Sequence, residues 1–355
     1  MSHDANTKTG IRQRKVDHLD LCAREDVEQR LTTTLLEEVR LLHDSLPELA
    51  VDEVDTGVEL FGRRLAAPLC ISGMTGGAEE ARAVNRELAA VAQRRGLAFG
   101  VGSQRAMLID PTLADTYAVR EVAPDVLLLA NIGVVQAAAT PVKALRGLVE
   151  AIGADALCVH LNPAQEMIQA GGDRDFRGGV DAFRRLVEEL GVPVIAKETG
   201  CGIAPRAARA LVGAGVEWVD VSGAGGTTWV GVEALRAQPG RREIGEDFWE
   251  WGVPTAASLW AAKAAGLRTI ASGGLRSSLD VARAIALGAE LCSMALPWLR
   301  ALREGGPEGA EAFAERLHEG LRVAMVLTGS RDLDALRAAP RFIGPTLERW
   351  MRLEG

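Results

Sequence analysis

Short apolar runs alternate with segments of helical periodicity over most of this chain, from Pro68 onward. The apolar runs are rich in aliphatic and β-branched residues, and they cover residues 68–75, 97–104, 125–133, 156–162, 193–199, 218–225, 268–274 and 291–296. Between them apolar positions recur every three or four residues, as at Val84, Leu88 and Val91. Almost continuously apolar strands, each followed by a helix, predict an α/β fold in which a closed parallel barrel is covered on both faces.

Residues 1–66 lie outside this alternation, so we expect an N-terminal extension that closes over a barrel domain formed by residues 67–355. Within the extension, the pattern predicts a helix over residues 24–49. Residues 58–65 predict a hairpin that turns at Gly62 and closes the bottom of the barrel. A doubly wound open sheet is the alternative architecture, but the strand count and the lack of an early Gly-x-Gly-x-x-Gly favour a (β/α)₈ TIM barrel.

The longest connection after a strand is residues 229–252, which combine charged residues with Trp229, Trp249 and Trp251. Long connections at this position often act as lids over an active site. The three indole rings either cover an apolar part of a substrate or pack within the lid itself.

Composition narrows the range of partners. The formal net charge of −8 gives no electrostatic support for binding nucleic acid. No apolar run approaches the ~20 residues of a membrane-spanning helix, and residues 1–20 are polar where a secretory signal would be apolar. The five cysteines have no paired spacing, which favours free thiols in a reducing compartment. We therefore expect a cytoplasmic protein.

Polar residues gather at the ends of the predicted strands, although polar side chains do not pack a barrel core. The active site of a barrel lies at the carboxyl ends of its strands. The segments at those ends are Met74-Thr75-Gly76-Gly77, Ser103-Gln104-Arg105, Asn131, His160-Leu161-Asn162 with Gln165-Glu166, Lys197-Glu198, Ser222-Gly223, Gly273-Gly274 and Ala295. Their position supports both the barrel fold and an enzymatic function.

Two glycine-rich loops indicate an anion site. Gly273 and Gly274 end the seventh run, and Ser277 or Ser278 begins the next helix. Backbone N–H groups of a glycine turn and of a helix N-terminus bind anions, although a tight turn with positive φ would also explain the glycine pair. A second loop, residues 222–227, faces the same side, and together the loops favour a cofactor that carries phosphate.

Lys197 ends a strand that is otherwise apolar. Burying an unpaired lysine charge is costly, so a lysine at a strand end is rarely a core residue. It could form a Schiff base, or it could place a cation against the pyrimidine edge of a flavin, which the nearby anion site favours. An ion pair with Glu198 or Asp220 is the structural alternative.

His160, Asn162, Gln165 and Glu166 form the most distinctive cluster. A single carboxylate with oxygen donors and substrate phosphates suits Mg²⁺, which keeps several waters and takes few protein ligands. Taken singly, Glu166 could be a solvated carboxylate and His160 a hydrogen-bonded interior histidine. Their presence at one strand end favours a functional site.

A short basic stretch near the N-terminus contains Arg12, Arg14, Lys15 and His18. Such a stretch is usually a solvated tail. If it folds over the barrel mouth, it could bind a diphosphate, which residues 103–105 would meet from the second strand.

The motifs of this chain resemble, in order, those of the type 2 isopentenyl-diphosphate delta-isomerases. They are Arg14-Lys15-x-x-His18, Ile71-Ser72-Gly73-Met74-Thr75-Gly76-Gly77, Gly102-Ser103-Gln104-Arg105, Ala130-Asn131-Ile132-Gly133, His160-Leu161-Asn162-Pro163-x-Gln165-Glu166, Gly172-Asp173-Arg174-Asp175-Phe176, Lys197-Glu198, residues 220–229, Trp251-Gly252-Val253-Pro254-Thr255 and Ser272-Gly273-Gly274-Leu275-Arg276. The glycine motifs recur in other FMN barrels, whereas the His-x-Asn-x-x-Gln-Glu run with Gly-Asp-Arg-Asp-Phe is far more specific.

The resemblance implies isomerisation of isopentenyl diphosphate, a small-molecule substrate, to dimethylallyl diphosphate, with reduced FMN as acid–base catalyst, Mg²⁺, and NADPH to reduce the flavin. It implies FMN contacts at Met74, Thr75, Gly76, Ser103, Asn131, Lys197, Ser222, Thr227, Gly273, Gly274, Arg276, Ala295 and Leu296. It implies substrate contacts at Arg14, Lys15, His18, Ser103, Gln104, Arg105 and Gln165, a catalytic group of His160, Asn162 and Gln165, and Glu166 on the metal. A homo-oligomer, a tetramer or octamer, is also implied.

The chain departs from the family pattern at Gly73, where a hydroxyl residue is usual beside the flavin, and at Ala170-Gly171 and Cys201. The first alternative function is an FMN-dependent 2-hydroxy-acid oxidoreductase, which needs a histidine base that is missing after the seventh strand. The second is a flavin or diphosphate binder without activity.

Overall fold

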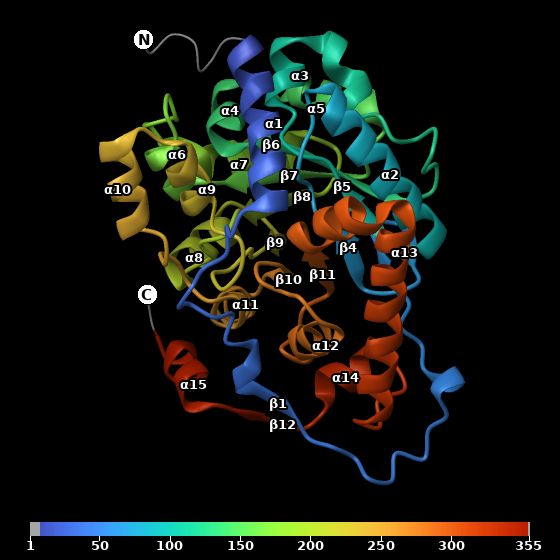
Figure 1. The fold of residues 1–355 in the computed structure, drawn as a ribbon. Coiled ribbons are helices and arrows are strands. Elements are labelled where there is room, and N and C mark those ends of the chain that lie inside the picture. Colours follow the sequence, from blue (N-terminus) through green and yellow to red (C-terminus); the bar gives the residue numbers. More distant parts are fainter. Residues whose placement is uncertain (1–7, 354–355) are drawn as a thin grey trace.

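The computed structural model describes residues 8–353, and the side chains from Gln13 onward. Eight parallel strands close into a barrel, which confirms the predicted (β/α)₈ architecture and excludes the open sheet (Figure 1). The strands are β4 (Leu69–Ile71), β5 (Ala98–Gly100), β6 (Leu127–Gly133), β7 (Ala156–Leu161), β8 (Val194–Glu198), β9 (Trp218–Asp220), β10 (Arg268–Ala271) and β11 (Leu291–Met294). Pairing of β11 with β4 closes the ring.

Helices surround the barrel and fill the connections between its strands. They are α2 (Glu79–Arg95), α3 (Arg105–Ile109), α4 (Val134–Ala139), α5 (Val142–Ile152), α6 (Pro163–Ile168), α7 (Gly179–Glu189), α8 (Pro205–Gly213), α9 (Trp229–Arg236), α10 (Pro239–Asp247), α11 (Thr255–Ala264), α12 (Ser278–Ala286), α13 (Leu296–Val326), α14 (Leu333–Ala338) and α15 (Pro345–Met351). The predicted apolar face of α2 is confirmed, because Val84, Leu88 and Val91 are buried. Ser277 caps α12, as its position predicted.

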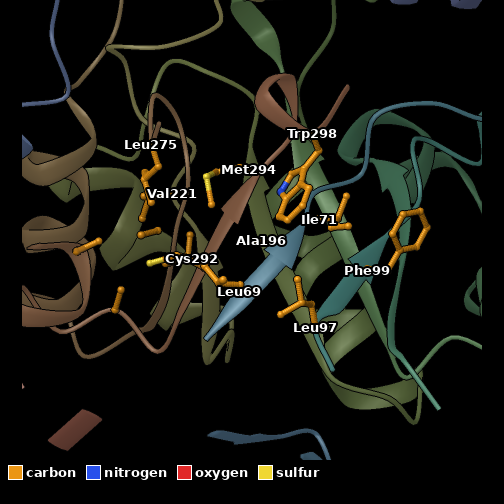
Figure 2. Close-up of a cluster of buried hydrophobic side chains, with 14 of the residues drawn as sticks. Leu69, Ile71, Leu97, Phe99, Ala196, Val221, Leu275, Cys292, Met294 and Trp298 are labelled. Atoms are coloured by element: carbon orange, nitrogen blue, oxygen red, sulfur yellow. The ribbon is translucent and has the colours of Figure 1, made fainter. Parts of the chain in front are cut away.

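Side chains alternate between two apolar layers along each strand. On β4, Leu69 and Ile71 point outward into the layer between strands and helices, in the same apolar cluster as Phe99 and Trp298 (Figure 2). Cys70 points inward, into the cluster that fills the barrel. The strands are thus buried on both faces, which explains why their sequences are almost continuously apolar.

The predicted hairpin is confirmed as β2 (Val58–Leu60) and β3 (Arg63–Leu65). Its turn residues Phe61 and Gly62 both have positive φ, 50° and 76°, as a two-residue hairpin turn requires. The hairpin packs into the barrel interior, where the ring of Phe61 lies 4.8 Å from that of Trp218. Because Trp218 begins its strand, the hairpin closes the amino-terminal end of the barrel and leaves the other end for the site.

The helix predicted over residues 24–49 is wrong. The helix of the extension is instead α1 (Lys8–Arg24), and the chain after it is extended, with a short turn at Leu36–Glu38 and a strand β1 (Val39–Leu41). β1 pairs with β12 (Arg341–Ile343), so the extension meets the C-terminal part of the chain beside the barrel (Figure 1). No periodicity signals this course, because distant groups satisfy the backbone of the segment: the Glu250 carboxylate, for example, accepts from the N–H groups of residues 30–32.

The extension shares its core with the barrel. Leu19, Val27 and Leu36 belong to the same apolar cluster as the outward-facing residues of the strands. None of the helices in residues 8–353 is both long and apolar enough to cross a membrane.

Candidate active site

A cavity opens at the carboxyl ends of the strands, with an empty volume of about 1510 Å³ that includes its open mouth. The lining includes these residues singled out from the sequence: Arg14, Lys15, His18, Met74, Thr75, Ser103, Arg105, Asn131, His160, Asn162, Gln165, Glu166, Lys197, Ser222, Thr227, Gly273, Gly274, Arg276, Ala295 and Leu296.

Two residues expected in the site, Gln104 and Gly76, do not line the cavity. The Gln104 side chain is fully buried: its Oε1 accepts from the N–H of Asn131 at 3.1 Å, and its Nε2 donates to the carbonyl of Leu148 at 3.0 Å. It braces the end of β6 instead of facing a ligand. At Gly76 a side chain would overlap the ring of Tyr117, so the glycine permits close packing.

The N-terminal helix α1 covers one side of the cavity with Arg14, Lys15 and His18, so the basic stretch is not a solvated tail. The side chain of Arg12 lies outside the described residues. Burial and the neighbouring charges of Arg14 and Arg105 lower the pKa of Lys15 to about 8. Cations that disfavour one another in this way form a site that an anion would stabilise.

Another part of the cavity wall has the geometry of a phosphate cradle. Gly273 and Gly274 adopt positive φ, 91° and 77°, and a side chain at either would overlap backbone of the neighbouring loop. Ala295 and Leu296, at the start of the long helix α13, line the cavity beside them. A glycine turn and a helix N-terminus together direct N–H groups and a favourable dipole at an anion.

The helix expected to complete this anion site was the wrong one. The N-terminus of α12 is occupied by its own side chains, because Asp280 Oδ2 accepts from the N–H groups of Arg276 and Ser277 at 3.1 and 3.0 Å. Its carboxylate also makes that terminus unfavourable for a second anion. The start of α13, which follows the neighbouring strand β11, lines the cavity instead.

Lys197 lies in the cavity wall and also forms the ion pair that was its structural alternative. Its Nζ lies 2.8 Å from Asp220 Oδ2, and the other carboxylate oxygen of Asp220 accepts from the hydroxyl of Ser272. Burial opposes the charge of Lys197, but Asp220 outweighs it and raises the pKa of the lysine. The site thus holds a fixed, protonated amine, which excludes the neutral amine that Schiff-base formation needs.

His160 is neutral and its ring is fixed. Its Nδ1 lies 2.8 Å from Asn131 Oδ1, so Nδ1 carries the proton and Nε2 is an acceptor. Burial, with the charges of Lys15, Lys197 and Arg105, lowers the pKa of His160 to about 3. At neutral pH this side chain can accept a hydrogen bond from a ligand, and it does not add to the positive charge.

Glu166 is buried and its carboxylate is already oriented. Oε1 accepts from Asn162 Nδ2 at 2.9 Å, and Oε2 accepts from Gln169 Nε2 at 3.1 Å and from the N–H of Asp173 at 2.8 Å. A side chain at Gly172 would overlap the backbone of Glu166, so the Gly-Asp-Arg-Asp-Phe motif folds directly around the carboxylate.

Sequence reasoning missed Glu233, which joins three elements of the site. This buried carboxylate on α9 accepts from His18 Nε2 and Arg236 Nη1 at 2.8 Å, and from Gln165 Nε2 at 3.3 Å. Burial opposes its charge, but these partners prevail and lower the pKa of Glu233 to about 2. The available signal was a single acid within the apolar run 230–235.

The predicted lid contains α9 and α10, and only one of its tryptophans reaches the cavity. Trp229 lines the cavity, with its ring 5.0 Å from that of His18. Trp249 is buried and donates from Nε1 to the carbonyl of Glu28 at 2.9 Å. Trp251 is 60% exposed. Packing within the segment therefore accounts for Trp249, and a substrate could contact Trp229 alone.

Comparison with known proteins gives three concordant results. The FMN-dependent dehydrogenase family model matches residues 163–341. Isopentenyl-diphosphate delta-isomerases are 43% identical in Methanothermobacter thermautotrophicus (97% of each chain covered), 44% in Archaeoglobus fulgidus (97% of this chain, 99% of the relative) and 47% in a Synechococcus species (95% and 98%). A solved mandelate oxidase variant with an FMN adduct has the same fold, with a TM-score of 0.65, 20% identity and coverage of 97% and 98%.

Proposed function

Because this chain belongs to the isopentenyl-diphosphate delta-isomerase family, we propose that it converts isopentenyl diphosphate to dimethylallyl diphosphate for isoprenoid biosynthesis, with FMN bound in its barrel. One observation supports this most directly: a single cavity is lined both by a glycine turn with the start of a helix and by a group of cations. The glycine turn and the start of α13 would suit the phosphate of a cofactor, and the cations of α1 would suit a diphosphate.

The residues present fit FMN. Thr75 lines the cavity, and its buried Oγ1 has no hydrogen-bond partner, as expected of a group that a polar ligand edge completes. Gly273 and Gly274 would hold the phosphate, and the protonated Lys197 would lie against the pyrimidine edge. Bound in reduced form, with NADPH as the reductant, FMN would supply an acid–base group and an electron-rich face for an alkene with developing positive charge.

Arg14, Lys15 and Arg105 would bind the diphosphate. His160 Nε2, with its ring fixed by Asn131, can only accept, so it would bind a water beside the diphosphate and not an ionised phosphate oxygen. Isomerisation adds a proton at one carbon and removes one two carbons away, and the ordinary side-chain acids are too weak for the first step. The protein would therefore contribute position, exclusion of water and fixed charges, and leave proton transfer to the flavin.

Mg²⁺ would bind at Glu166 and the diphosphate. Among residues 8–353 no cluster of three or more His, Cys, Asp or Glu side chains is placed to hold a metal. A single carboxylate with amide oxygens nearby suits an ion that keeps several waters and takes its remaining ligands from a phosphate. Glu166 is preset for this by Asn162 and Gln169.

Gln165 would be held against the substrate by Glu233. Because Glu233 is ionised at neutral pH, it accepts from the amide nitrogen of Gln165, while the amide oxygen of Gln165 accepts from Asn162 Nδ2 at 3.2 Å. His18 is bound to the same carboxylate, so docking of α1 and the orientation of Gln165 depend on one group.

The 2-hydroxy-acid alternative lacks support. The loop after β10 reads Ser272-Gly273-Gly274-Leu275, with no histidine to act as the base. The likeness to mandelate oxidase, at 20% identity, shows the shared fold alone.

The decisive experiment is anaerobic turnover of isopentenyl diphosphate with FMN, Mg²⁺ and NADPH, followed by product formation. We expect dimethylallyl diphosphate only when the flavin is reduced, with no net NADPH consumed per turnover. A yellow, folded protein that gives no product would move the proposal to another flavin reaction.

The working form of the enzyme is also proposed. We infer a cytoplasmic homo-oligomer, a tetramer or octamer, in which residues 1–66 close over the barrel of each subunit. All five cysteines are free in the structure, which fits a reducing compartment. Light scattering of the purified enzyme gives its mass directly, and a monomer would contradict the proposed assembly.

A further inference from the structure

Glu28, on the extended segment after α1, lies between two arginines. Its Oε1 accepts from Arg276 Nε at 3.0 Å and Nη2 at 2.5 Å, and its Oε2 accepts from Arg300 Nη1 at 3.1 Å. Arg276 follows the glycine turn after β10, and Arg300 lies in the first turns of α13. One carboxylate of the extension thus links the two elements that form the proposed phosphate cradle.

Backbone pairing fixes Glu28 at this place. It forms an antiparallel bridge with Thr227, a cavity-lining residue of the other glycine-rich loop. The N–H of Thr228 donates to the carbonyl of Val27, and the N–H of Gln29 donates to that of Gly226, both at 2.9 Å. The extended segment therefore lies directly against a loop that lines the cavity, although Glu28 itself is not part of the lining.

The same segment leads directly into α1, which ends at Arg24. Arg300 also donates from Nη2 to the carbonyl of Glu25 at 3.2 Å, between the helix and Glu28. The middle of α1 carries Arg14 and Lys15 to the proposed diphosphate site. A short, well-anchored connection thus joins the phosphate cradle to the helix that covers the cavity.

The donors of Arg276 are already occupied. Nε and Nη2 bond to Glu28, and Nη1 donates to the carbonyl of Leu275 at 2.8 Å. In this arrangement the guanidinium does not need to bind phosphate directly, since backbone N–H groups of the cradle can do so. Two arginines face one carboxylate here, so a phosphate nearby would compensate the excess positive charge.

We propose that Glu28 is a positioning residue that couples binding of the cofactor phosphate to docking of α1 over the cavity. This inference rests on the proposed function, because it takes FMN as the ligand of the cradle. Phosphate binding orders the glycine turn and the start of α13. This ordering fixes Arg276 and Arg300 in the positions where they bind Glu28. Because Glu28 is joined to α1 by a short connection, α1 is then held over the cavity. Such coupling is reciprocal, so docking of α1 strengthens phosphate binding by the same factor.

The test compares FMN with riboflavin, which lacks the phosphate, by quenching of flavin fluorescence. We expect Glu28→Gln to weaken FMN binding by about 5- to 20-fold and riboflavin binding by less than about twofold. Glu25→Gln is the matched control, since it makes the same change on an exposed side chain three residues away and should leave both affinities unchanged. A general loss of folding would weaken both ligands equally.

Hydrogen exchange provides the second readout. In the wild-type and Glu25→Gln proteins, saturating FMN should slow exchange of the amides in residues 8–24, and saturating riboflavin should not. In Glu28→Gln, and in the second variant Arg300→Gln, FMN at saturation should no longer slow it. The coupling would be overturned if FMN protected these residues in Glu28→Gln as strongly as in the wild type. It would also be overturned if Glu28→Gln bound FMN as tightly as the wild type or more tightly.

The two proposals fail separately. If FMN binds the wild type and the coupling is absent, the isomerase proposal still holds. If the coupling is present and no dimethylallyl diphosphate forms, the coupling proposal still holds and the isomerase proposal is wrong. Wild-type protein that binds no FMN would overturn both.

Discussion

At the scale of single residues, the site contains several buried charged side chains, and not all of them have a partner of opposite charge. Lys197 has a partner in Asp220, and Glu233 has His18 and Arg236. Lys15 differs, because its nearest charges are mostly of its own sign. This contrast separates the groups that hold the site together from a group that is completed by a ligand.

Lys15 should give substrate binding a distinct pH dependence. Its pKa of about 8 lies within reach of assay conditions, so kcat/KM should fall by up to about tenfold per pH unit above pH 8 as the free enzyme loses this charge. Lys15→Arg should shift that fall to higher pH. Measuring kcat/KM from pH 6 to 10 for both proteins tests this, and identical profiles would contradict the role of Lys15.

The same shift makes a prediction for stability. The pKa of Lys15 is lower in the folded protein than its ordinary value of 10.5, so between about pH 8 and 10.5 the unfolded chain binds more protons. The contribution of Lys15 to folding stability therefore rises with pH over this window and is unfavourable below it. Urea unfolding of wild type and Lys15→Met at pH 7 and pH 9.5 should show that the advantage of the variant shrinks at the higher pH.

Asp220 should matter for stability as well as for the site. Asp220→Asn leaves the Lys197 charge buried without a counter-ion, which should cost about 3–5 kcal/mol of unfolding free energy. Asp175→Asn is the matched control: it removes an exposed pair with Arg177, so it should leave the unfolding free energy nearly unchanged. Urea unfolding of both variants measures the difference, and equal small losses would mean that Lys197 finds another partner.

Glu166→Gln tests the proposed metal site. The substitution keeps the shape of the side chain, but it removes the negative charge and replaces one carboxylate oxygen with an NH₂ group. That NH₂ group would face the donors from Asn162, Gln169 and Asp173. Turnover as a function of Mg²⁺ concentration should require much more metal, with a circular dichroism spectrum like that of wild type. An unchanged dependence on Mg²⁺ would refute the role of Glu166.

At the scale of elements, the local sequence pattern was enough to predict the barrel strands, but it was not enough to predict the structure of the N-terminal extension. Leu69, Cys70 and Ile71 are apolar because both faces of their strand are buried, and this is visible in sequence. The course of residues 24–49 depends on partners more than 200 positions away, such as Glu250 for Thr32 and Thr227 for Glu28. No local period records such contacts.

The residues of the site also divide into those that the sequence could predict and those that it could not. Residues at strand ends, such as His160 and Lys197, could be found because polar side chains interrupt an apolar pattern. Glu233 lies within a helix, and its role depends on α1 crossing the cavity, which the sequence offered only as one alternative. Gln104 shows the opposite error, since a strand-end residue can also point into the protein.

The glycine turn after β10 allows a matched test at this scale. Gly274 (φ 77°) and Gly266 (φ 97°) both need a left-handed backbone, but an added Cβ would overlap the carbonyl of Gly225 at the first and meet nothing within 4 Å at the second. Gly274→Ala should therefore weaken FMN binding at least tenfold, whereas Gly266→Ala should only lower stability by about 1–2 kcal/mol. Equal FMN affinities would show that the turn does not form the cradle.

At the scale of the whole molecule, extension and barrel have one continuous core, since Leu19 and Leu36 pack in the cluster that surrounds the strands. We therefore expect the FMN-loaded enzyme to unfold in urea in a single transition, with backbone circular dichroism and tryptophan fluorescence coinciding. At FMN a hundredfold above its Kd, the unfolding free energy should rise by about 2.7 kcal/mol, because the folded state alone binds the ligand. An early transition that removes helical signal while the fluorescence of the buried Trp298 and its neighbours persists would mean that α1 detaches before the barrel opens. Since α1 carries one anion site and the barrel the other, that outcome would place substrate binding and cofactor binding in separate cooperative units.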